Sequence, residues 1–423
     1  MTNYTNKIFK NISLILLFFI FTASLYLGLY LNETISGPGS KADFYHTWNY
    51  VLALEKDILA SPKGWTVHTP LHYMFLSLLN IIFNDQNLIR FIICTLSLLV
   101  PILFYYNLKI KFPIMNRKLI FLFSLSIFLF PSFRYSAIWA NDHISGLIFF
   151  LSSTLFFIKW EKNKLGLIDK DIILSIVFLT LAVYTRQYYA LIFIYYLFIF
   201  IQKLKFLDFI KLSSFIFVLS LPGFWLIFNF PSLLKTTFTY KFHNTLLINF
   251  SILGFYLLPF FLSYFCLEKN AFSKDKKNIY LSGLISFILI IFLLFIGFDY
   301  FQTSPNAGGG FFLKISYIFF KNPYFFYLSS LIGAFFIILI CFQDNKSILI
   351  FLLLVFGFSG YVIFQKYFEP MFIFIFLLLI KTRITETFFM NYKNLIIYYV
   401  YIFLYFTSAL INDYYKITLN IQY

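Results

Sequence analysis

The 423-residue chain is poor in charge, and this scarcity excludes most soluble classes of protein. Asp, Glu, Lys and Arg make up 12% of its residues, whereas hydrophobic residues make up 61%. A water-soluble globule of this length could not cover its surface with so few charged side chains. Apolar runs close to the length of a membrane-spanning helix recur along the chain. The composition therefore predicts an all-α polytopic membrane protein.

Cysteine is also scarce, which bears on disulfides and metals. Cys94, Cys266 and Cys341 all fall inside apolar runs, so neither a disulfide framework nor a zinc cluster is predicted. The net charge of +16 could indicate nucleic-acid binding. However, the basic residues form short clusters between apolar runs instead of an aromatic-lined groove. We therefore expect no nucleic-acid partner, and we interpret these clusters as cytoplasmic loops.

The apolar runs predict about 13 transmembrane helices with the amino terminus on the cytoplasmic side. Their expected ranges are 11–31, 88–107, 119–133, 144–158, 172–184, 188–201, 212–228, 250–266, 279–297, 323–342, 347–363, 370–380 and 395–411. This threading places most of the basic residues on the cytoplasmic side. We expect a single membrane domain over 1–423, composed of a module with the first outer loop, 1–201, and a variable helical module, 202–423.

The first outer loop, 32–87, is the longest polar stretch in the first half of the chain. After a turn at 37–39, Asp43 stands where an amphipathic helix can begin, and the helix would end at 61–64. Its apolar stripe, which includes Trp48, suits the membrane interface. The apolar run 71–83 is too short for a span of about 20 residues. We interpret it as a re-entrant or interfacial helix.

Charged side chains near membrane depth are costly, by about 2.5 to 3.5 kcal/mol each, and tend to have a partner or a function. We predict that one outward-facing cleft collects those on the outer side, and that this cleft is the functional site. The candidates are Asp43 with His46, His68 with His72 and Tyr73, Arg134 with Asp142 and His143, Arg186 with Gln187, and Lys366 with Glu369.

Each candidate has a structural alternative. Asp43 and Asp142 could each cap a helix. His68 and His72, four residues apart, could bind zinc, but Thr69 replaces the Glu of the metalloprotease pattern, so hydrogen bonding at the cleft mouth is favoured.

The two basic candidates also have alternatives. Arg186 interrupts an apolar stretch between two short helices, as a phosphate-binding Arg or a snorkelling anchor would. Lys366 and Glu369 could simply pair with each other.

Several short motifs resemble a known family when read in order. They are Asp43-Phe44-Tyr45-His46, His68-Thr69-Pro70-Leu71-His72-Tyr73, Ile89-Arg90-Phe91, Phe130-Pro131-Ser132 with Asn141-Asp142, and Thr185-Arg186-Gln187. The sequence resembles the GT-C superfamily of glycosyltransferases. Over about 40–195 it is most similar to the dolichyl-phosphate-glucose alpha-1,2-glucosyltransferase family, with its Asp-Glu-x-Phe-His and Thr-Thr-Pro-x-x-Tyr motifs.

The resemblance also has departures. Phe44 replaces the second acid of the first motif, and the family's carboxyl-terminal Asp-Asn-Arg-His-Tyr motif has no counterpart. The segment 365–370, Gln-Lys-Tyr-Phe-Glu-Pro, instead resembles the late outer-face motif of bacterial GT-C enzymes such as lipid A aminoarabinose and protein mannosyltransferases.

The resemblance implies an inverting transfer of a hexose from a polyprenyl-phosphate sugar to a lipid, glycan or protein acceptor. It implies the periplasmic face of a bacterial inner membrane or the luminal face of the endoplasmic reticulum. Asp43 would be the general base. The expected substrate-binding residues are His46, His68, His72, Tyr73, Arg134, Asp142, Arg186, Gln187, Lys366 and Glu369, with Arg186 as the first choice for the phosphate.

Other features of the predicted site stay open. No cofactor or metal ligand is predicted, although a divalent cation is compatible with these residues. Trp48 and Trp65 could stack on a sugar, and the glycine run 308–310 could form a mobile loop over the donor. The membrane lipid is an expected partner, and the oligomeric state stays open. The alternative functions are a lipid-linked saccharide flippase or transporter and a surface polysaccharide polymerase.

Overall fold

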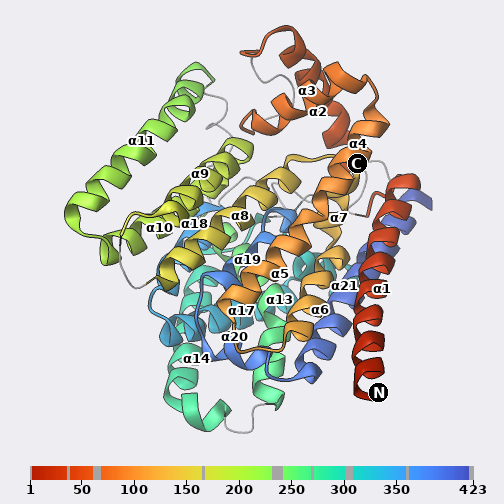
Figure 1. The fold of residues 1–423 in the computed structure, drawn as a ribbon. Coiled ribbons are helices and arrows are strands. Elements are labelled where there is room, and N and C mark those ends of the chain that lie inside the picture. Colours follow the sequence, from red (N-terminus) through yellow and green to blue (C-terminus); the bar gives the residue numbers. More distant parts are fainter. Residues whose placement is uncertain are drawn as a thin grey trace. The chain divides into compact units, whose positions relative to one another are not determined.

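The computed structural model describes residues 2–35, 39–60, 68–163, 167–230, 242–267, 271–300, 308–358 and 362–418. In these ranges the chain forms helices and turns, without strands (Figure 1). They make up two compact units. The first unit contains Met1–Gln187, Ser214–Phe224 and Tyr399–Gln422, and the second contains Tyr188–Ser213 and Trp225–Tyr398. The change at Gln187 precedes the module boundary predicted at residue 201.

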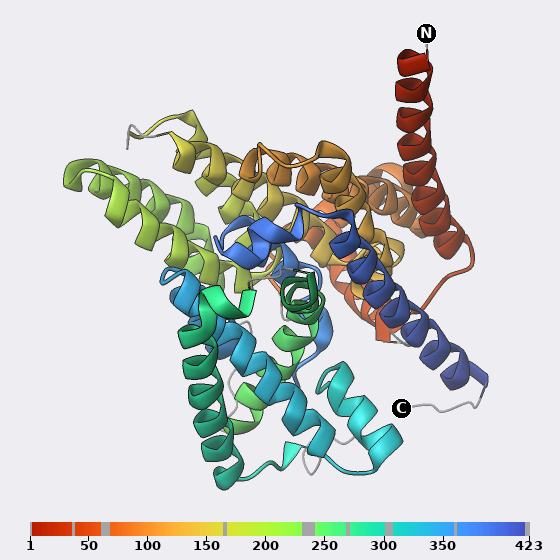
Figure 2. The same cartoon turned by 90° about the horizontal axis from the view of Figure 1, so that it is seen from below.

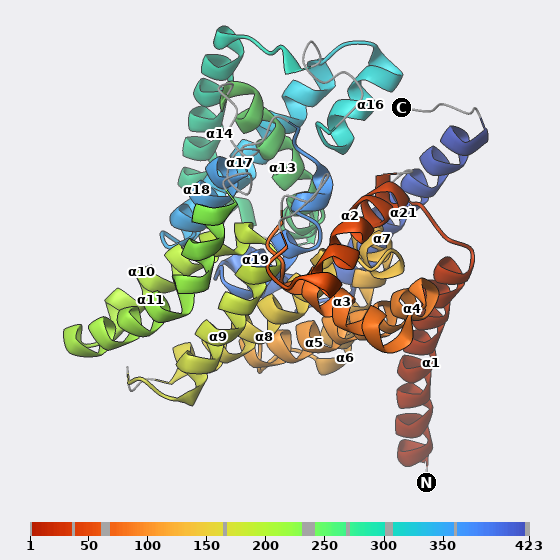
Figure 3. The same ribbon diagram turned by 90° about the horizontal axis from the view of Figure 1, so that it is seen from above.

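The helices of the first unit follow the predicted order closely. They are α1 (Thr2–Tyr30), α2 (Gly39–Lys56), α3 (Leu71–Phe83), α4 (Gln86–Ser97), α5 (Leu99–Lys111), α6 (Arg117–Leu125), α7 (Pro131–Ile138), α8 (Asp142–Lys162) and α9 (Lys170–Thr185), with the 3-10 turns η1 (Ser126–Leu129) and η2 (Gln187–Tyr189). α8 and α9 pack side by side, as do α2, α3 and α4 (Figures 1 and 3). These contacts bring the starts of α3 and α8 and the end of α9 into one region.

The remaining helices belong mainly to the second unit. They are α10 (Ala190–Lys203), α11 (Phe206–Asn229), α13 (Phe242–Leu267), α14 (Ala271–Ile296), α16 (Phe311–Phe320), α17 (Tyr324–Gln343), α18 (Ser347–Gly357), α19 (Met371–Leu378), α20 (Arg383–Phe388) and α21 (Tyr392–Thr418), with the 3-10 turn η3 (Gln365–Tyr367). Parts of α11 and α21 fall in the first unit. α13 packs against α14 and α17 (Figures 1 and 2).

Close contact between α13 and α17 depends on two glycines. A Cβ on Gly333 would lie 1.9 Å from the Phe250 carbonyl oxygen, and a Cβ on Gly254 would lie 2.6 Å from the Gly333 Cα. Small residues let helix backbones approach in membranes, where interhelical packing replaces the hydrophobic drive. The two glycines therefore set the separation of these helices.

Seven of the described helices are long and apolar enough to cross a membrane, which fits a polytopic helical membrane protein. They are Gln86–Lys111, Asp142–Lys162, Phe206–Asn229, Phe242–Cys266, Asp275–Ile296, Tyr324–Gln343 and Tyr392–Asn412. The predicted count of about 13 also included 11–31, where Leu14–Tyr30 is a shorter apolar helix, and the broken helix 119–133. It further included α9, α10, α18 and α19, which have 16, 14, 11 and 8 residues. These four are shorter than an ordinary span of about 20 residues.

The helix predicted over 119–133 is broken. Arg117–Leu129 and Pro131–Ile138 form a pair bent by 66°. Proline has no backbone N–H and disfavours helical conformation in the residue before it. Accordingly, Phe130 is extended, with φ −77° and ψ 118°, and Pro131 begins α7. All eight residues of α7 are buried, so this short helix presents Arg134 and Tyr135 inside the first unit.

The first outer loop contains both helices that the sequence predicts. α3 has the predicted bounds, 71–83. α2 begins at Gly39, before Asp43, and ends at Lys56. Phe44, Trp48 and Val51 are buried in the protein and so do not face the membrane interface as expected, whereas Leu52, Ile58 and Leu59 are exposed. The reason is aromatic packing, because the Phe44 ring lies 5.2 Å from Trp48 and 6.1 Å from Trp139.

Candidate functional site

A buried ion pair joins the start of α8 to the end of α9. Asp142 is the first residue of α8, and Arg186 directly follows α9. The Arg186 Nη2 lies 2.9 Å from the Asp142 Oδ1, and the side chains are 5% and 1% exposed. Burying either charge alone would be very costly, so each makes the other tolerable. The sequence placed both residues in one cleft, and the structure brings them into direct contact.

Two residues of the segment before and within α3 extend this pair. The His68 Nε2 lies 3.4 Å from the Arg186 Nη2, and the Tyr73 hydroxyl lies 3.4 Å from the Asp142 Oδ2. Both distances are longer than a strong hydrogen bond, so we regard them as polar contacts. We call His68, Tyr73, Asp142 and Arg186 the charged cluster. Three segments far apart in the sequence contribute to it.

Asp142 does not act as the helix cap that was its structural alternative. The N-cap of α8 is Asn141, and Asp142 occupies the first helical position. Its carboxylate meets Arg186 and the Tyr73 hydroxyl. A negative charge in the first turn of a helix is also favoured by the helix dipole. The position of Asp142 thus serves the charged cluster and α8 together.

His72 has a structural role beside the charged cluster. Its Nε2 lies 2.9 Å from the Ala140 carbonyl oxygen, and its Nδ1 lies 2.8 Å from the Ser145 Oγ. A carbonyl only accepts, so Nε2 carries a proton and donates. Burial lowers the pKa of His72 below its ordinary value, which favours the neutral ring. His72 lies in α3, which has 13 residues and is not one of the helices long enough to span the membrane.

These contacts bear on the zinc alternative for His68 and His72. Because Nε2 of His72 is protonated and Nδ1 contacts Ser145, neither nitrogen is directed at an open metal position. Among the described residues, no group of three or more His, Cys, Asp and Glu side chains could hold a metal ion. His72 thus makes hydrogen bonds within the protein, while the predicted hydrogen bonding at a cleft mouth stays a prediction.

Asp43 lies inside α2 and is not its N-cap, because the helix begins at Gly39. The Tyr135 hydroxyl, from the buried helix α7, donates to the Asp43 Oδ2 at 3.0 Å. Burial raises the pKa of Tyr73, the carboxylate of Asp142 raises it further, and the guanidinium of Arg186 lowers it. Tyr135 was not predicted, because its only sequence signal is its position after Arg134.

Arg134 holds two helices together. Its Nε and Nη2 donate to Glu33 at 2.8 and 2.6 Å, and Nη1 donates to the Ser24 Oγ at 3.0 Å. A Cβ on Gly28 would lie 2.5 Å from the Glu33 Oε2, so this glycine makes room for the pair. All three nitrogens of Arg134 therefore have partners within the first unit, and its substrate-binding role stays a prediction.

The other predicted residues lie in different surroundings. His46 is exposed on α2, and Gln187 begins η2. Trp65 and the predicted helix end at 61–64 lie outside the described residues, as do Gly37 and Pro38 of the predicted turn. The substrate-binding roles of His46 and Gln187 stay predictions.

Lys366 and Glu369 belong to the second unit. Glu369 is buried and accepts a hydrogen bond of 2.7 Å from the Tyr256 hydroxyl. The Lys366 Nζ lies 5.3 Å from the centre of the Phe364 ring, within cation–π distance. Their substrate-binding role stays a prediction.

The glycine run in the second unit differs from the predicted mobile loop. Gly308, Gly309 and Gly310 have φ values of +71°, +77° and +81° and are buried. Gly309 N–H donates to the Ile363 carbonyl at 2.8 Å. This left-handed backbone explains the glycines, because other residues rarely adopt it. The rest of the predicted loop, 301–307, lies outside the described residues.

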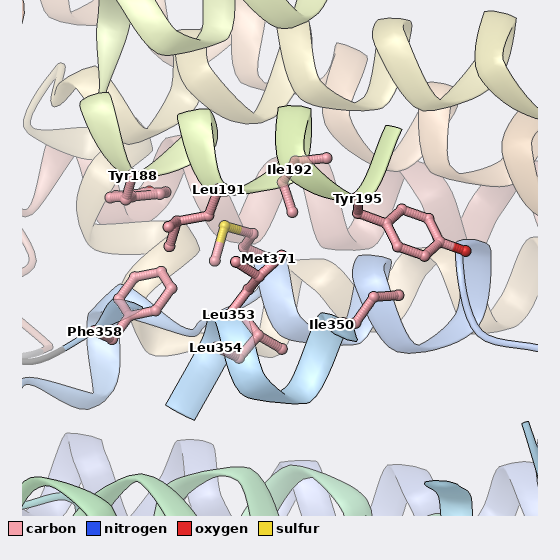
Figure 4. A pocket seen from close by; sticks show the side chains of 9 residues that line it. All are labelled: Tyr188, Leu191, Ile192, Tyr195, Ile350, Leu353, Leu354, Phe358 and Met371. Carbon is pink, nitrogen blue, oxygen red and sulfur yellow. The ribbon is translucent and has the colours of Figure 1, made fainter. Parts of the chain in front are cut away.

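A small hydrophobic cavity lies between α10 and α18 in the second unit (Figure 4). Its lining residues are Tyr188, Leu191, Ile192, Tyr195, Ile350, Leu353, Leu354, Phe358 and Met371. The Tyr195 hydroxyl donates to the Leu379 carbonyl at 3.2 Å. This lining suits an apolar chain better than a sugar or a phosphate.

No family model, curated protein or solved structure matches the chain.

Proposed function

We propose that this chain is a membrane glycosyltransferase that moves a hexose from a polyprenyl-phosphate sugar to a lipid, glycan or protein acceptor. The supporting observation is the charged cluster, in which motif residues from three distant segments meet. Asp43, from a fourth segment, belongs to the same unit and accepts a hydrogen bond from Tyr135. Buried charged groups that gather in this way are typical of functional sites in membrane proteins.

The proposed reaction uses Asp43 as the general base. Asp43 takes the proton of the acceptor hydroxyl while that oxygen bonds to the anomeric carbon. The bond from the anomeric carbon to the phosphate oxygen breaks, and polyprenyl phosphate leaves with the electron pair. The Tyr135 hydrogen bond would position the Asp43 carboxylate for this step.

The leaving phosphate needs positive charge, and Arg186 is the proposed source. A guanidinium has five N–H donors in a planar fork, so one edge can hold Asp142 while another binds a phosphate oxygen. The ion pair with Asp142 would keep the fork in one orientation. Donors placed in advance around developing charge account for much of the catalysis in such sites.

The lipid part of the donor would lie in the membrane beside the spanning helices. By the charge distribution, the site would face the periplasm or the lumen. The sugar and the acceptor stay open within this class.

Donor consumption tests the proposal. The purified wild type would be incubated in detergent with a panel of radiolabelled polyprenyl-phosphate sugars and a mixed glycolipid extract. We expect release of polyprenyl phosphate and transfer of label from one donor of the panel. If the folded protein consumes no donor but moves lipid-linked saccharides across proteoliposomes, the chain is a transporter and the proposal is wrong.

A further inference from the structure

Asn141 stands in a rigid turn between α7 and α8. Ala140 is left-handed, with φ +46°, and the Asn141 N–H donates to the Ser136 carbonyl at 2.9 Å. This is the hydrogen bond of a Schellman turn, with alanine at the position that usually carries glycine. The His72 Nε2 donates to the Ala140 carbonyl. The turn therefore fixes the backbone from which the Asn141 side chain projects.

The Asn141 side chain does not cap α8, although Asn141 occupies the N-cap position. Asn141 is the N-cap of α8, with φ −80° and ψ 153°. Asparagine is favoured there because its side-chain oxygen can accept from the first amides of the helix. In the structure it accepts none from the described backbone of α8. The N-terminal end of α8 therefore lacks its own side-chain cap.

The amide nitrogen of the same side chain is enclosed. Asn141 is 9% exposed, and its Nδ2 is buried without a hydrogen-bond partner among the described residues. Buried polar groups are nearly always paired, so such an atom indicates a ligand or a bound water. Nδ2 can only donate, so its partner must be an acceptor.

The surroundings favour an anionic acceptor. The N-terminus of a helix carries partial positive charge and exposes amides, which suits phosphate. Asn141 directly precedes Asp142, whose carboxylate holds Arg186 at 2.9 Å. We propose that the N-terminal end of α8 binds the phosphate of the lipid-linked donor, with the Asn141 Nδ2 donating to a phosphate oxygen. This inference rests on the proposed function and adds the position of the phosphate.

The test measures binding, so it does not depend on turnover. Affinity for a short-chain polyprenyl phosphate, the matching polyprenol and inorganic phosphate would be measured by titration in detergent for the wild type, Asn141→Asp and Asn141→Ala. Asn141→Asp keeps the size of the side chain and a favoured N-cap, but it removes the donor and adds a repelling charge. We expect both variants to bind polyprenyl phosphate about 10- to 100-fold more weakly, as for a lost hydrogen bond to a charged group.

Asn107→Ala is the matched control. Asn107 is buried in the same unit, and its Nδ2 already donates to the Leu103 and Leu151 carbonyls, each at 2.9 Å. This variant should lose stability but keep its affinity for polyprenyl phosphate. The control separates loss of folding from loss of a ligand contact.

The outcomes distinguish this inference from the proposed function. Weaker binding by both Asn141 variants, together with competition by inorganic phosphate, supports the phosphate site. Wild-type affinity in Asn141→Asp means that a water satisfies Nδ2, which overturns the inference while leaving the transferase proposal in place. If the wild type does not prefer polyprenyl phosphate to polyprenol, the inference and the proposed function are both wrong.

Discussion

Neutralising the buried ion pair of Asp142 and Arg186 separates its structural role from its proposed catalytic role. Both side chains are at least 95% buried, being 5% and 1% exposed, so water screens their interaction weakly. Asp142→Asn or Arg186→Gln alone leaves one charge without its partner. We expect each single variant to lose about 3 kcal/mol of unfolding free energy. The double variant, which is neutral, should regain about 2 kcal/mol relative to either single variant.

The assay has two readouts. Unfolding in detergent gives the stability of the four proteins in the cycle, and release of polyprenyl phosphate gives their activity. If Arg186 binds the phosphate, the double variant regains stability but not activity, because its guanidinium is absent. Recovery of wild-type activity in the double variant would refute the phosphate role of Arg186.

The exposed pair of Asp208 and Lys211 provides the control for this cycle. Their charged atoms lie 3.8 Å apart, and the Lys211 side chain is 73% exposed. Surface pairs of this kind contribute about 0 to 1 kcal/mol. A coupling as small as this in the Asp142 and Arg186 cycle would show that the buried contact does not form.

Three further predictions concern single residues. Tyr135→Phe should keep the fold but lower the rate of transfer about 10-fold, because the Asp43 carboxylate loses its positioning hydrogen bond; an unchanged rate in the release assay would exclude that role. Gly333→Ala should lower stability by about 2 kcal/mol or more, because its Cβ meets the backbone of α13, whereas Gly283→Ala, with nothing within 4 Å, should be neutral or slightly stabilising in the same unfolding assay. The folded state lowers the pKa of His72, so the unfolded state binds the proton more readily. The wild type should therefore lose unfolding free energy as the pH falls below about 6.5, and His72→Gln should reduce that loss. An equal loss in both proteins would contradict this role of His72.

The fold was predictable where one helix carries its own signal. The apolar run 71–83 stands after Pro70 and forms α3 with these bounds. Asp43 was a misleading helix start, because the chain is already helical from Gly39. Pro131 carried the signal for the bend after α6, but the continuous apolar run outweighed it. Four of the predicted spans form helices of 16 residues or fewer, and the predicted count of 13 is not confirmed.

The site was predictable only in part, because contacts between distant segments leave no local signal in the sequence. Charges in an apolar chain identified Asp142 and Arg186 as residues that need an explanation, and they meet. The partner of Asp43, Tyr135, depends on how α2 packs against α7, which no local pattern encodes. Likewise, the pairing of Arg134 with Glu33 depends on the contact between α1 and α7. Sequence patterns indicate which residues are costly to bury, whereas tertiary packing decides which of them become partners.

The most direct test of the transferase proposal compares Asp43→Asn with Asp57→Asn. Asp57 is an exposed acid just beyond α2, where its Oδ1 accepts from the Leu59 N–H at 2.9 Å. Both variants would be purified beside the wild type and supplied with the donor that the wild type consumes. The proposal predicts that Asp57→Asn releases polyprenyl phosphate as the wild type does, while Asp43→Asn releases it at least about 100-fold more slowly, as for loss of a general base. Release by Asp43→Asn at the wild-type rate would contradict the role of Asp43 and the proposed mechanism.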